Sequence, residues 1–135
     1  MMQPKKILLV DDEPLILRSM QKTLLRAGYT VGIGSNCTEG LAVFKAAQES
    51  ETPFDMALVD LNMPGFDGGE ASGAGMDLIS HVIEIRPDFP IIVLSAYDEV
   101  SKVKEAVTRG ARGYCVKGRE KTLLDQIKHI FEENA

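Results

Sequence analysis

The chain has 135 residues, of which 44% are hydrophobic and 26% are charged, and its formal net charge is −5 at pH 7. This length suits one domain with a single core, and the composition is that of a globular rather than a disordered protein. The acidic balance argues against direct binding to nucleic acid, and no apolar run approaches the roughly 20 residues that span a bilayer.

The first residues show no signal-peptide pattern, because their short apolar run leads directly into acidic residues. The two cysteines, Cys37 and Cys115, lie far apart without metal-ligand spacing. Thiols of this kind are typically reduced in the cytosol. We therefore expect a cytoplasmic domain over residues 1–135, with no membrane contact and no catalytic role for either cysteine.

Short apolar runs alternate with amphipathic segments along the chain. The first run, residues 6–10, predicts a strand that is buried on both faces. A helix is expected from Pro14, which suits a first helical turn, until Gly28, which suits a helix end. Residues 29–34 then predict a second strand.

A second helix is indicated by Asn36 followed by Glu39, which resembles a capping box, and it should run to about residue 48. The remaining elements follow in the order strand 56–59, a helix that ends before Pro87, strand 91–94, a helix from Val100 to Gly110, strand 113–116 and a last helix marked by apolar residues over 123–131. Five repeats of strand then helix predict an α/β fold with a parallel sheet covered by helices on both faces.

Polar residues collect where the predicted strands end, which is where ligands bind in open parallel sheets. Asp11, Asp12 and Glu13 follow the first strand, Asp60 the third, Ser95 the fourth and Lys117 the fifth. With strand order 2-1-3-4-5, the three aspartates share one site, and a cation such as Mg²⁺, which prefers oxygen ligands, relieves their repulsion. A carboxylate nucleophile at Asp60, beside a metal and Lys117, indicates phosphoryl transfer.

Each of these residues has an ordinary structural interpretation when it is taken alone. Asp11 or Asp12 would cap the first helix, Asp60 would begin a turn, Ser95 would be a loop hydroxyl and Lys117 a solvated lysine. Their joint placement at one edge of one sheet favours the functional interpretation of the set.

Four segments resemble the receiver domain of bacterial two-component response regulators, the CheY-like superfamily. They are ILLVDDEP from Ile7, ALVDLNMPG from Ala57, IIVLSAY from Ile91 and GARGYCVKG from Gly110. Together they extend over nearly the whole chain. The resemblance implies a flavodoxin-like three-layer sandwich, with a five-stranded parallel sheet of order 2-1-3-4-5 and five helices.

The resemblance also implies a phosphorylation site. Asp60 would accept a phosphoryl group from the phosphohistidine of a sensor histidine kinase or phosphotransfer protein. Asp12 and Asp60 would bind Mg²⁺, or Mn²⁺, directly, whereas Asp11 would act through a water molecule. The backbone carbonyl of Asn62 would complete the protein ligands.

A switch would follow from the same resemblance. Ser95 and Lys117 would hold the phosphoryl oxygens, so that phosphorylation biases an equilibrium between two surfaces. Tyr114 would change rotamer on activation, or would be a strand aromatic that never moves. Asn62 and Tyr97 would flank the phosphoryl group and tune its lifetime. The fourth helix, fifth strand and fifth helix would face a downstream protein or output domain, or a second copy in a homodimer.

Two features depart from the family pattern. Gly118 follows Lys117 where proline is usual, and because a non-proline cis bond costs about 2.5–4 kcal/mol, we expect a trans bond with an unusual glycine conformation. A glycine-rich insertion at about 66–75 lengthens the loop after Asp60. A neutral surface insertion is favoured over a role in shielding the acyl phosphate or binding a partner.

The same residues argue against other functions. A haloacid-dehalogenase-type phosphatase would need Asp-x-Asp after the first strand, and a dinucleotide-binding domain would need G-x-G-x-x-G there; the sequence has neither. An interaction module that is never phosphorylated is disfavoured by the intact acidic set. The expected protein is not a conventional enzyme, although it catalyses its own phosphorylation and dephosphorylation. It is either a stand-alone relay or the receiver of a longer regulator.

Overall fold

The computed structural model of the chain describes residues 4–61, 74–95 and 100–133. These residues form β1 (Lys6–Val10), α1 (Pro14–Arg26), β2 (Thr30–Gly34), α2 (Cys37–Gln48), β3 (Met56–Asp60), α3 (Ala74–Ile85), β4 (Ile91–Ser95), α4 (Val100–Arg109), β5 (Gly113–Val116) and α5 (Glu120–Glu133). Within the described ranges, no helix has both the length and the apolar character needed to cross a membrane.

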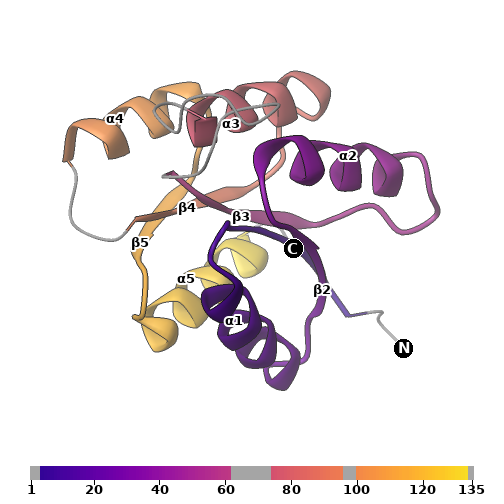
Figure 1. Cartoon of the computed structure of the whole chain (residues 1–135), viewed down its shortest axis with the longest axis vertical. Helices are drawn as coiled ribbons and strands as arrows, with labels where there is room; N and C mark the ends of the chain where they lie inside the picture. The colour runs from indigo at the N-terminus through magenta and orange to yellow at the C-terminus, as the bar shows by residue number, and fades with distance from the viewer. Residues whose placement is uncertain (1–3, 62–73, 96–99, 134–135) are drawn as a thin grey trace.

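The strands form one parallel sheet of order β2-β1-β3-β4-β5. β1 lies between β2 and β3, with Val10 opposite Gly34 on one side and Val59 on the other. Helices α2, α3 and α4 cover one face of the sheet, and α1 and α5 cover the other (Figure 1). The predicted three-layer sandwich and its strand order are confirmed.

Two apolar clusters hold the layers together, one on each face of the sheet. In β1, Leu8 and Val10 join the cluster under α2, α3 and α4, whereas Ile7 and Leu9 join the cluster under α1 and α5. All four side chains are fully buried. Burial on both faces explains why this strand is a continuous apolar run in the sequence rather than an alternating one.

Strand boundaries differ slightly from the sequence prediction. β3 and β4 each extend one residue beyond their apolar runs, so that Asp60 and Ser95 are themselves the last strand residues. β2 begins at Thr30 rather than at Tyr29. Tyr29 lies in the turn that follows α1, because its backbone N–H donates to the Leu24 carbonyl at 3.1 Å.

The start of α2 confirms the predicted cap. Asn36 Oδ1 accepts a hydrogen bond from the Glu39 backbone N–H at 2.8 Å. The Glu39 side chain reaches back to the backbone N–H of Ser35, at 2.9 Å, instead of that of Asn36 itself. The first bond satisfies a backbone N–H that the first turn of the helix would otherwise leave unpaired, and the second satisfies the N–H of a residue just before the helix.

Helix α3 begins at Ala74, so the last two positions of the predicted insertion belong to this helix. The rest of the insertion lies outside the described residues. At Gly75 an added Cβ would stand 2.6 Å from the Asp60 carbonyl oxygen and 2.8 Å from Leu61 Cα. Glycine is therefore required here by close packing, because it lets the first turn of α3 lie directly against the end of β3.

Candidate functional site

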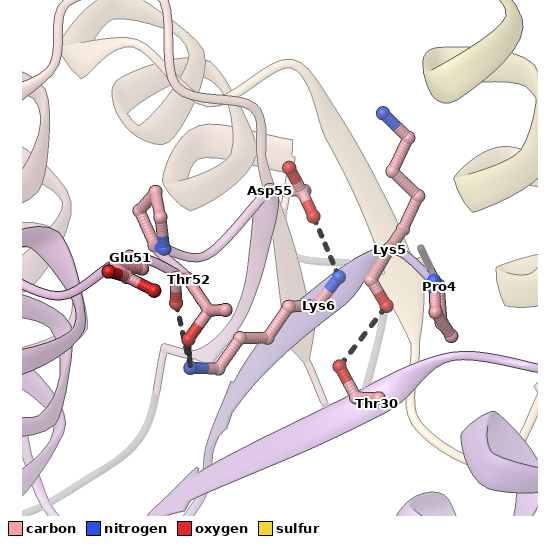
Figure 2. Close-up of a pocket in the computed structure, with 8 residues that line it drawn as sticks. Pro4, Lys5, Lys6, Thr30, Glu51, Thr52 and Asp55 are labelled. Atoms are coloured by element: carbon pink, nitrogen blue, oxygen red, sulfur yellow. Dashed lines mark hydrogen bonds between the residues drawn. The ribbon is translucent and has the colours of Figure 1, made fainter. Parts of the chain in front are cut away.

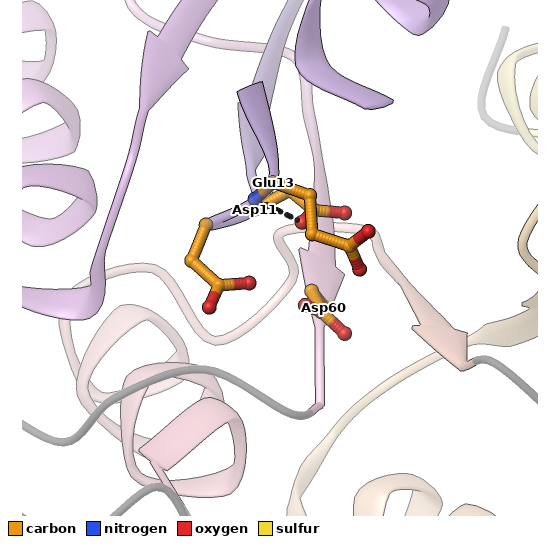
Figure 3. Close-up of side chains that lie close together, drawn as sticks. Asp11, Glu13 and Asp60 are labelled. Carbon is orange, nitrogen blue, oxygen red and sulfur yellow. Dashed lines mark hydrogen bonds between the residues drawn. The ribbon is translucent and has the colours of Figure 1, made fainter. Parts of the chain in front are cut away.

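The acidic residues predicted to share a site come together at the carboxyl ends of β1 and β3. Val10 and Val59 are opposite each other in the sheet, so the residues that follow them, Asp11 and Asp60, are neighbours. Ligand oxygens of Asp11, Asp12, Glu13 and Asp60 all lie within 4.8 Å of one another. Figure 3 shows how closely the side chains of Asp11, Glu13 and Asp60 approach.

Two of these carboxylates are buried, with 0% of Asp11 and 1% of Asp60 exposed. Burying an ionised carboxylate costs several kcal/mol unless a charge or hydrogen bonds compensate it. Asp11 Oδ1 accepts the backbone N–H of Glu13 at 3.0 Å, which holds that side chain under the start of α1. A lysine that follows β5 at the same edge of the sheet adds further compensation.

Lys117 places its ammonium group among three carboxylates. Its Nζ lies 2.9 Å from Asp11 Oδ2, 3.0 Å from Asp60 Oδ2 and 3.0 Å from Glu13 Oε1. Burial by itself would lower the pKa of Lys117, but the contacts with Asp11, Glu13 and Asp60 outweigh it and hold the pKa above its ordinary value. Lys117 is therefore fully charged near neutral pH.

The direction of Lys117 is set by the end of β5. Its backbone N–H donates to the Ser95 carbonyl at 2.8 Å, which ties the end of β5 to the end of β4. Gly118 then takes a positive φ of 92°, and no peptide bond among the described residues is cis. Both expectations for this position are confirmed, since glycine supplies a left-handed turn that lets Lys117 reach Asp60 without proline.

The remaining predicted residues are placed as follows. Ser95 is fully buried at the end of β4, opposite Val116 in β5, and so lies at the same edge as Asp60. Tyr114 is half-buried against the cluster under α2, α3 and α4. Asn62 and Tyr97 lie outside the described residues.

Glu13 is a site residue that the sequence analysis did not assign. It occupies the N-cap position of α1, yet its side chain makes no cap hydrogen bond and instead contacts Lys117. The only signal in the sequence was a third acid directly after Asp11 and Asp12, and such an acid ordinarily indicates a helix cap.

The donor set fits a hard divalent cation. Every ligand that the described residues offer is a carboxylate oxygen, and neither cysteine belongs to the group. Mg²⁺ is typically bound by one or two carboxylates with several waters, whereas zinc prefers nitrogen and sulfur ligands. One ammonium group cannot neutralise four carboxylates, so the site retains negative charge that a divalent cation would balance.

A hollow also lies at the opposite, amino edge of the sheet, away from these acids. Its volume is about 520 Å³, and its lining includes Lys5, Lys6, Thr30, Thr52 and Asp55 (Figure 2). Some polar groups there are paired within the protein, because Lys6 Nζ donates to the Thr52 carbonyl at 2.8 Å and the Lys6 backbone N–H donates to Asp55 Oδ2 at 2.8 Å. The lining holds lysines as well as acidic residues, so its charges are of both signs.

The parallel sheet, with buried acids at the carboxyl edge and a lysine directed at them, defines a CheY-like receiver fold. Residues 7–128 match the family described as the response regulator receiver domain. The chain belongs to this family of two-component signalling proteins, as the sequence predicted.

Relatives of the chain come from several kinds of organism. A CheY-like receiver domain from Methanospirillum hungatei JF-1 is 30% identical, with a TM-score of 0.81 over 96% of this chain and 95% of that one. The chemotaxis protein CheY4 of Vibrio cholerae is 29% identical, with a TM-score of 0.78 over 93% and 98% of the two chains.

Plant response regulators are also similar. The two-component response regulator ORR26 of Oryza sativa subsp. japonica is 30% identical over 95% of this chain, and ARR18 of Arabidopsis thaliana is 30% identical over 96%. The chain spans about a fifth of the length of these curated relatives, 20% and 19% respectively. These plant relatives weaken the expectation of a bacterial protein that the resemblance had suggested.

Proposed function

We propose that the domain is a phosphoacceptor, and that Asp60 receives a phosphoryl group from the phosphohistidine of a histidine kinase or phosphotransfer protein. The observation that carries this proposal is the buried carboxylate of Asp60, held 3.0 Å from Lys117 within a group of four acids. Such a concentration of like charge is costly in a resting protein. It is useful where charge on a transferring group must be bound and neutralised.

The transfer uses the atoms of Asp60 as nucleophile. A carboxylate oxygen attacks the phosphorus atom, and the bond between phosphorus and the donor's imidazole nitrogen breaks with its electron pair leaving on nitrogen. The products are an acyl phosphate and an imidazole. In the later hydrolysis, water attacks the phosphorus atom and releases inorganic phosphate and the Asp60 carboxylate. Lys117 stabilises the charge on the phosphoryl oxygens in both steps, and Ser95 adds a hydroxyl donor.

A divalent cation, Mg²⁺ or Mn²⁺, would be held by Asp11, Asp12, Asp60 and the backbone carbonyl of Asn62. When bound, it supplies the positive charge that lets an anionic donor approach an anionic nucleophile. Support comes from the all-oxygen donor set and from the excess of carboxylates over ammonium groups at this edge.

The readout would be a change of surface. Ser95 lies at the end of β4 and Lys117 directly after β5, so a phosphoryl group that binds both side chains would fix their positions relative to Asp60. Tyr114 in β5 is joined to α5, because Gln126 Nε2 donates to its carbonyl at 2.9 Å. The face formed by α4, β5 and α5 would present this change to a downstream protein, an output domain or a second copy in a cytoplasmic setting. The positions of Asn62 and Tyr97 would set the phosphoryl lifetime.

The proposal is tested by measuring intact mass after incubation with Mg²⁺ and a small phosphodonor such as phosphoramidate. The wild-type chain should gain one phosphoryl group that is labile to hydroxylamine, and chelation of Mg²⁺ should prevent the gain. Asp60→Asn should gain none, because the amide is not a nucleophile of this kind.

Asp55→Asn is the matched control, because it removes a carboxylate of the same kind at the opposite edge of the sheet. It should be phosphorylated like the wild type. If neither phosphoramidate nor beryllofluoride, a mimic of the bound phosphoryl group, acts on the wild-type chain, the phosphoacceptor proposal is wrong and an interaction module is favoured.

A further inference from the structure

The contact between Glu13 and Lys117 is not explained by folding. Glu13 is the N-cap of α1, a position where a carboxylate ordinarily accepts a backbone N–H of the first turn. Here the side chain makes no such bond. It turns instead toward the end of β5 and accepts a hydrogen bond from Lys117 Nζ at 3.0 Å.

The three carboxylates around Lys117 differ in how readily they can leave. Asp11 and Asp60 are buried at the ends of β1 and β3, but the Glu13 side chain is 58% exposed. A glutamate at the surface can rotate into water at little cost, since its hydration replaces the ion pair. Glu13 is thus the removable member of the group.

The hydrogen-bond geometry points the same way. Lys117 Nζ donates to Glu13 Oε1 at 3.0 Å, and it also lies 2.9 Å from Asp11 Oδ2 and 3.0 Å from Asp60 Oδ2. An ammonium group has three N–H donors, and a phosphoryl group on Asp60 needs at least one of them. The donor now used by Glu13 is bonded to the most exposed of the three carboxylates.

We propose that Glu13 is a displaceable counter-ion of Lys117, which holds the ammonium group in place before phosphorylation and competes with the phosphoryl oxygens for it afterwards. The inference rests on the proposed function of Asp60 and goes further by assigning a positioning residue that opposes uptake. Phosphorylation adds roughly −1.5 to −2 charges beside Glu13, so repulsion helps to release the carboxylate at the moment when Lys117 is needed.

Because Glu13 competes for Lys117, the site should bind phosphoryl-like anions less tightly than it would without the Glu13 charge. Removing the Glu13 charge should strengthen anion binding, the opposite of what removing Lys117 or Asp60 should do. An exposed ion pair corresponds to about a two- to fivefold change in an equilibrium constant, and that is the size of effect expected.

The experiment titrates beryllofluoride into the full chain at saturating Mg²⁺, with binding followed by NMR chemical shifts. Glu13→Gln, which keeps the shape of the side chain, should bind about two- to fivefold more tightly than the wild type. Glu84→Gln is the matched control, since it removes one exposed negative charge from α3 away from Lys117. It should bind like the wild type.

A second measurement separates a counter-ion from a metal ligand. Mg²⁺ binding without beryllofluoride should change by less than about threefold in Glu13→Gln, because Glu13 is engaged with Lys117 rather than with the cation. Unchanged or weaker beryllofluoride binding in Glu13→Gln would overturn the proposal, and so would a tenfold loss of Mg²⁺ affinity. If the wild-type chain binds no beryllofluoride at all, the proposed function fails first and the role of Glu13 fails with it.

Discussion

The two edges of the sheet treat charge in opposite ways. At the amino edge, three cationic side chains donate to loop carbonyls: Lys6 to that of Thr52, Arg86 to that of Phe54 at 2.6 Å, and Arg112 to that of Asp88 at 2.8 Å. At the carboxyl edge, four acids lie together, and three of them contact the ammonium group of Lys117. The first arrangement stabilises the fold, whereas the second concentrates like charge in a way that is typical of functional sites.

The largest effect should come from removing Lys117, the cation that contacts the buried acids at the carboxyl edge. Lys117→Met leaves Asp11 and Asp60 buried without their counter-charge, and we expect the free energy of unfolding to fall by about 3 kcal/mol without divalent cations. Urea denaturation at neutral pH measures this. Because the pKa of Lys117 is raised, its stabilising contribution is complete below the ordinary lysine pKa and is lost only as pH rises through the higher folded-state value.

Added Mg²⁺ provides the check on this interpretation. If crowded carboxylates cause the loss, saturating Mg²⁺ should recover part of it, because the ion binds the folded state. A Lys117→Met variant that is as stable as the wild type in chelator would show that the acids are not in electrostatic conflict.

The amino edge should respond more weakly and without dependence on Mg²⁺. Arg86 donates to the Phe54 carbonyl, and its guanidinium lies 4.8 Å from the centre of the Phe89 ring. Arg86→Met should lower the free energy of unfolding by about 1.5 kcal/mol, the size of one charge-assisted hydrogen bond. Arg18→Met, at an exposed position on α1, is the control and should stay within about 0.5 kcal/mol. Equal effects of the two variants would contradict the structural role given to Arg86.

Neutralising a carboxylate should raise the free energy of unfolding at the carboxyl edge and lower it at the amino edge. Asp60→Asn relieves repulsion with Asp11, while Lys117 keeps two other carboxylates, so we expect a gain of about 1 kcal/mol in chelator. Asp55→Asn weakens a hydrogen bond to the Lys6 backbone and should cost about 0.5–1 kcal/mol. Thermal or urea denaturation of both variants measures these changes. A lower free energy of unfolding in Asp60→Asn would refute the claim that the crowded acids at this edge destabilise the fold.

Much of this contrast could be predicted from the sequence. The central strands are buried on both faces, so they appear as apolar runs, and the polar residues that interrupt them, Asp60 and Ser95, mark the strand ends. The shared site of Asp11 and Asp60 then follows from the strand order alone. The strand ends and the shared site could be predicted because both depend on the order of the strands and not on the direction of single side chains.

The missed features depend on the direction of single side chains. Glu13 has the residue type of a helix cap, and only its rotamer places it on Lys117. Gly75 looks in the sequence like part of a glycine-rich loop, yet it lies in α3. Glycine is needed there because the Asp60 carbonyl leaves no room for a side chain. Asn62 and Tyr97 stay predictions, since both lie outside the described residues.

The smallest expected effect concerns the reach of the negative field at the carboxyl edge. Burial, together with the negative charges of Asp77, Asp60 and Asp12, raises the pKa of the Cys37 thiol to about 11. Burial also raises the pKa of Cys115, but there the positive charge of Arg119 acts in the opposite direction. The two buried thiols therefore report on different electrostatic surroundings.

Alkylation by iodoacetamide at pH 8.5, followed by peptide mass, can detect this difference. Both thiols should react far more slowly in the folded chain than in urea, with Cys37 the slower, because only the thiolate reacts. Asp60→Asn removes one of the charges acting on Cys37 and should raise the rate at Cys37 by about two- to threefold relative to the rate at Cys115. The ratio of the two rates is the measured quantity, because a change in the stability of the fold alters both rates alike. An unchanged ratio would show that the charge of Asp60 does not act on Cys37.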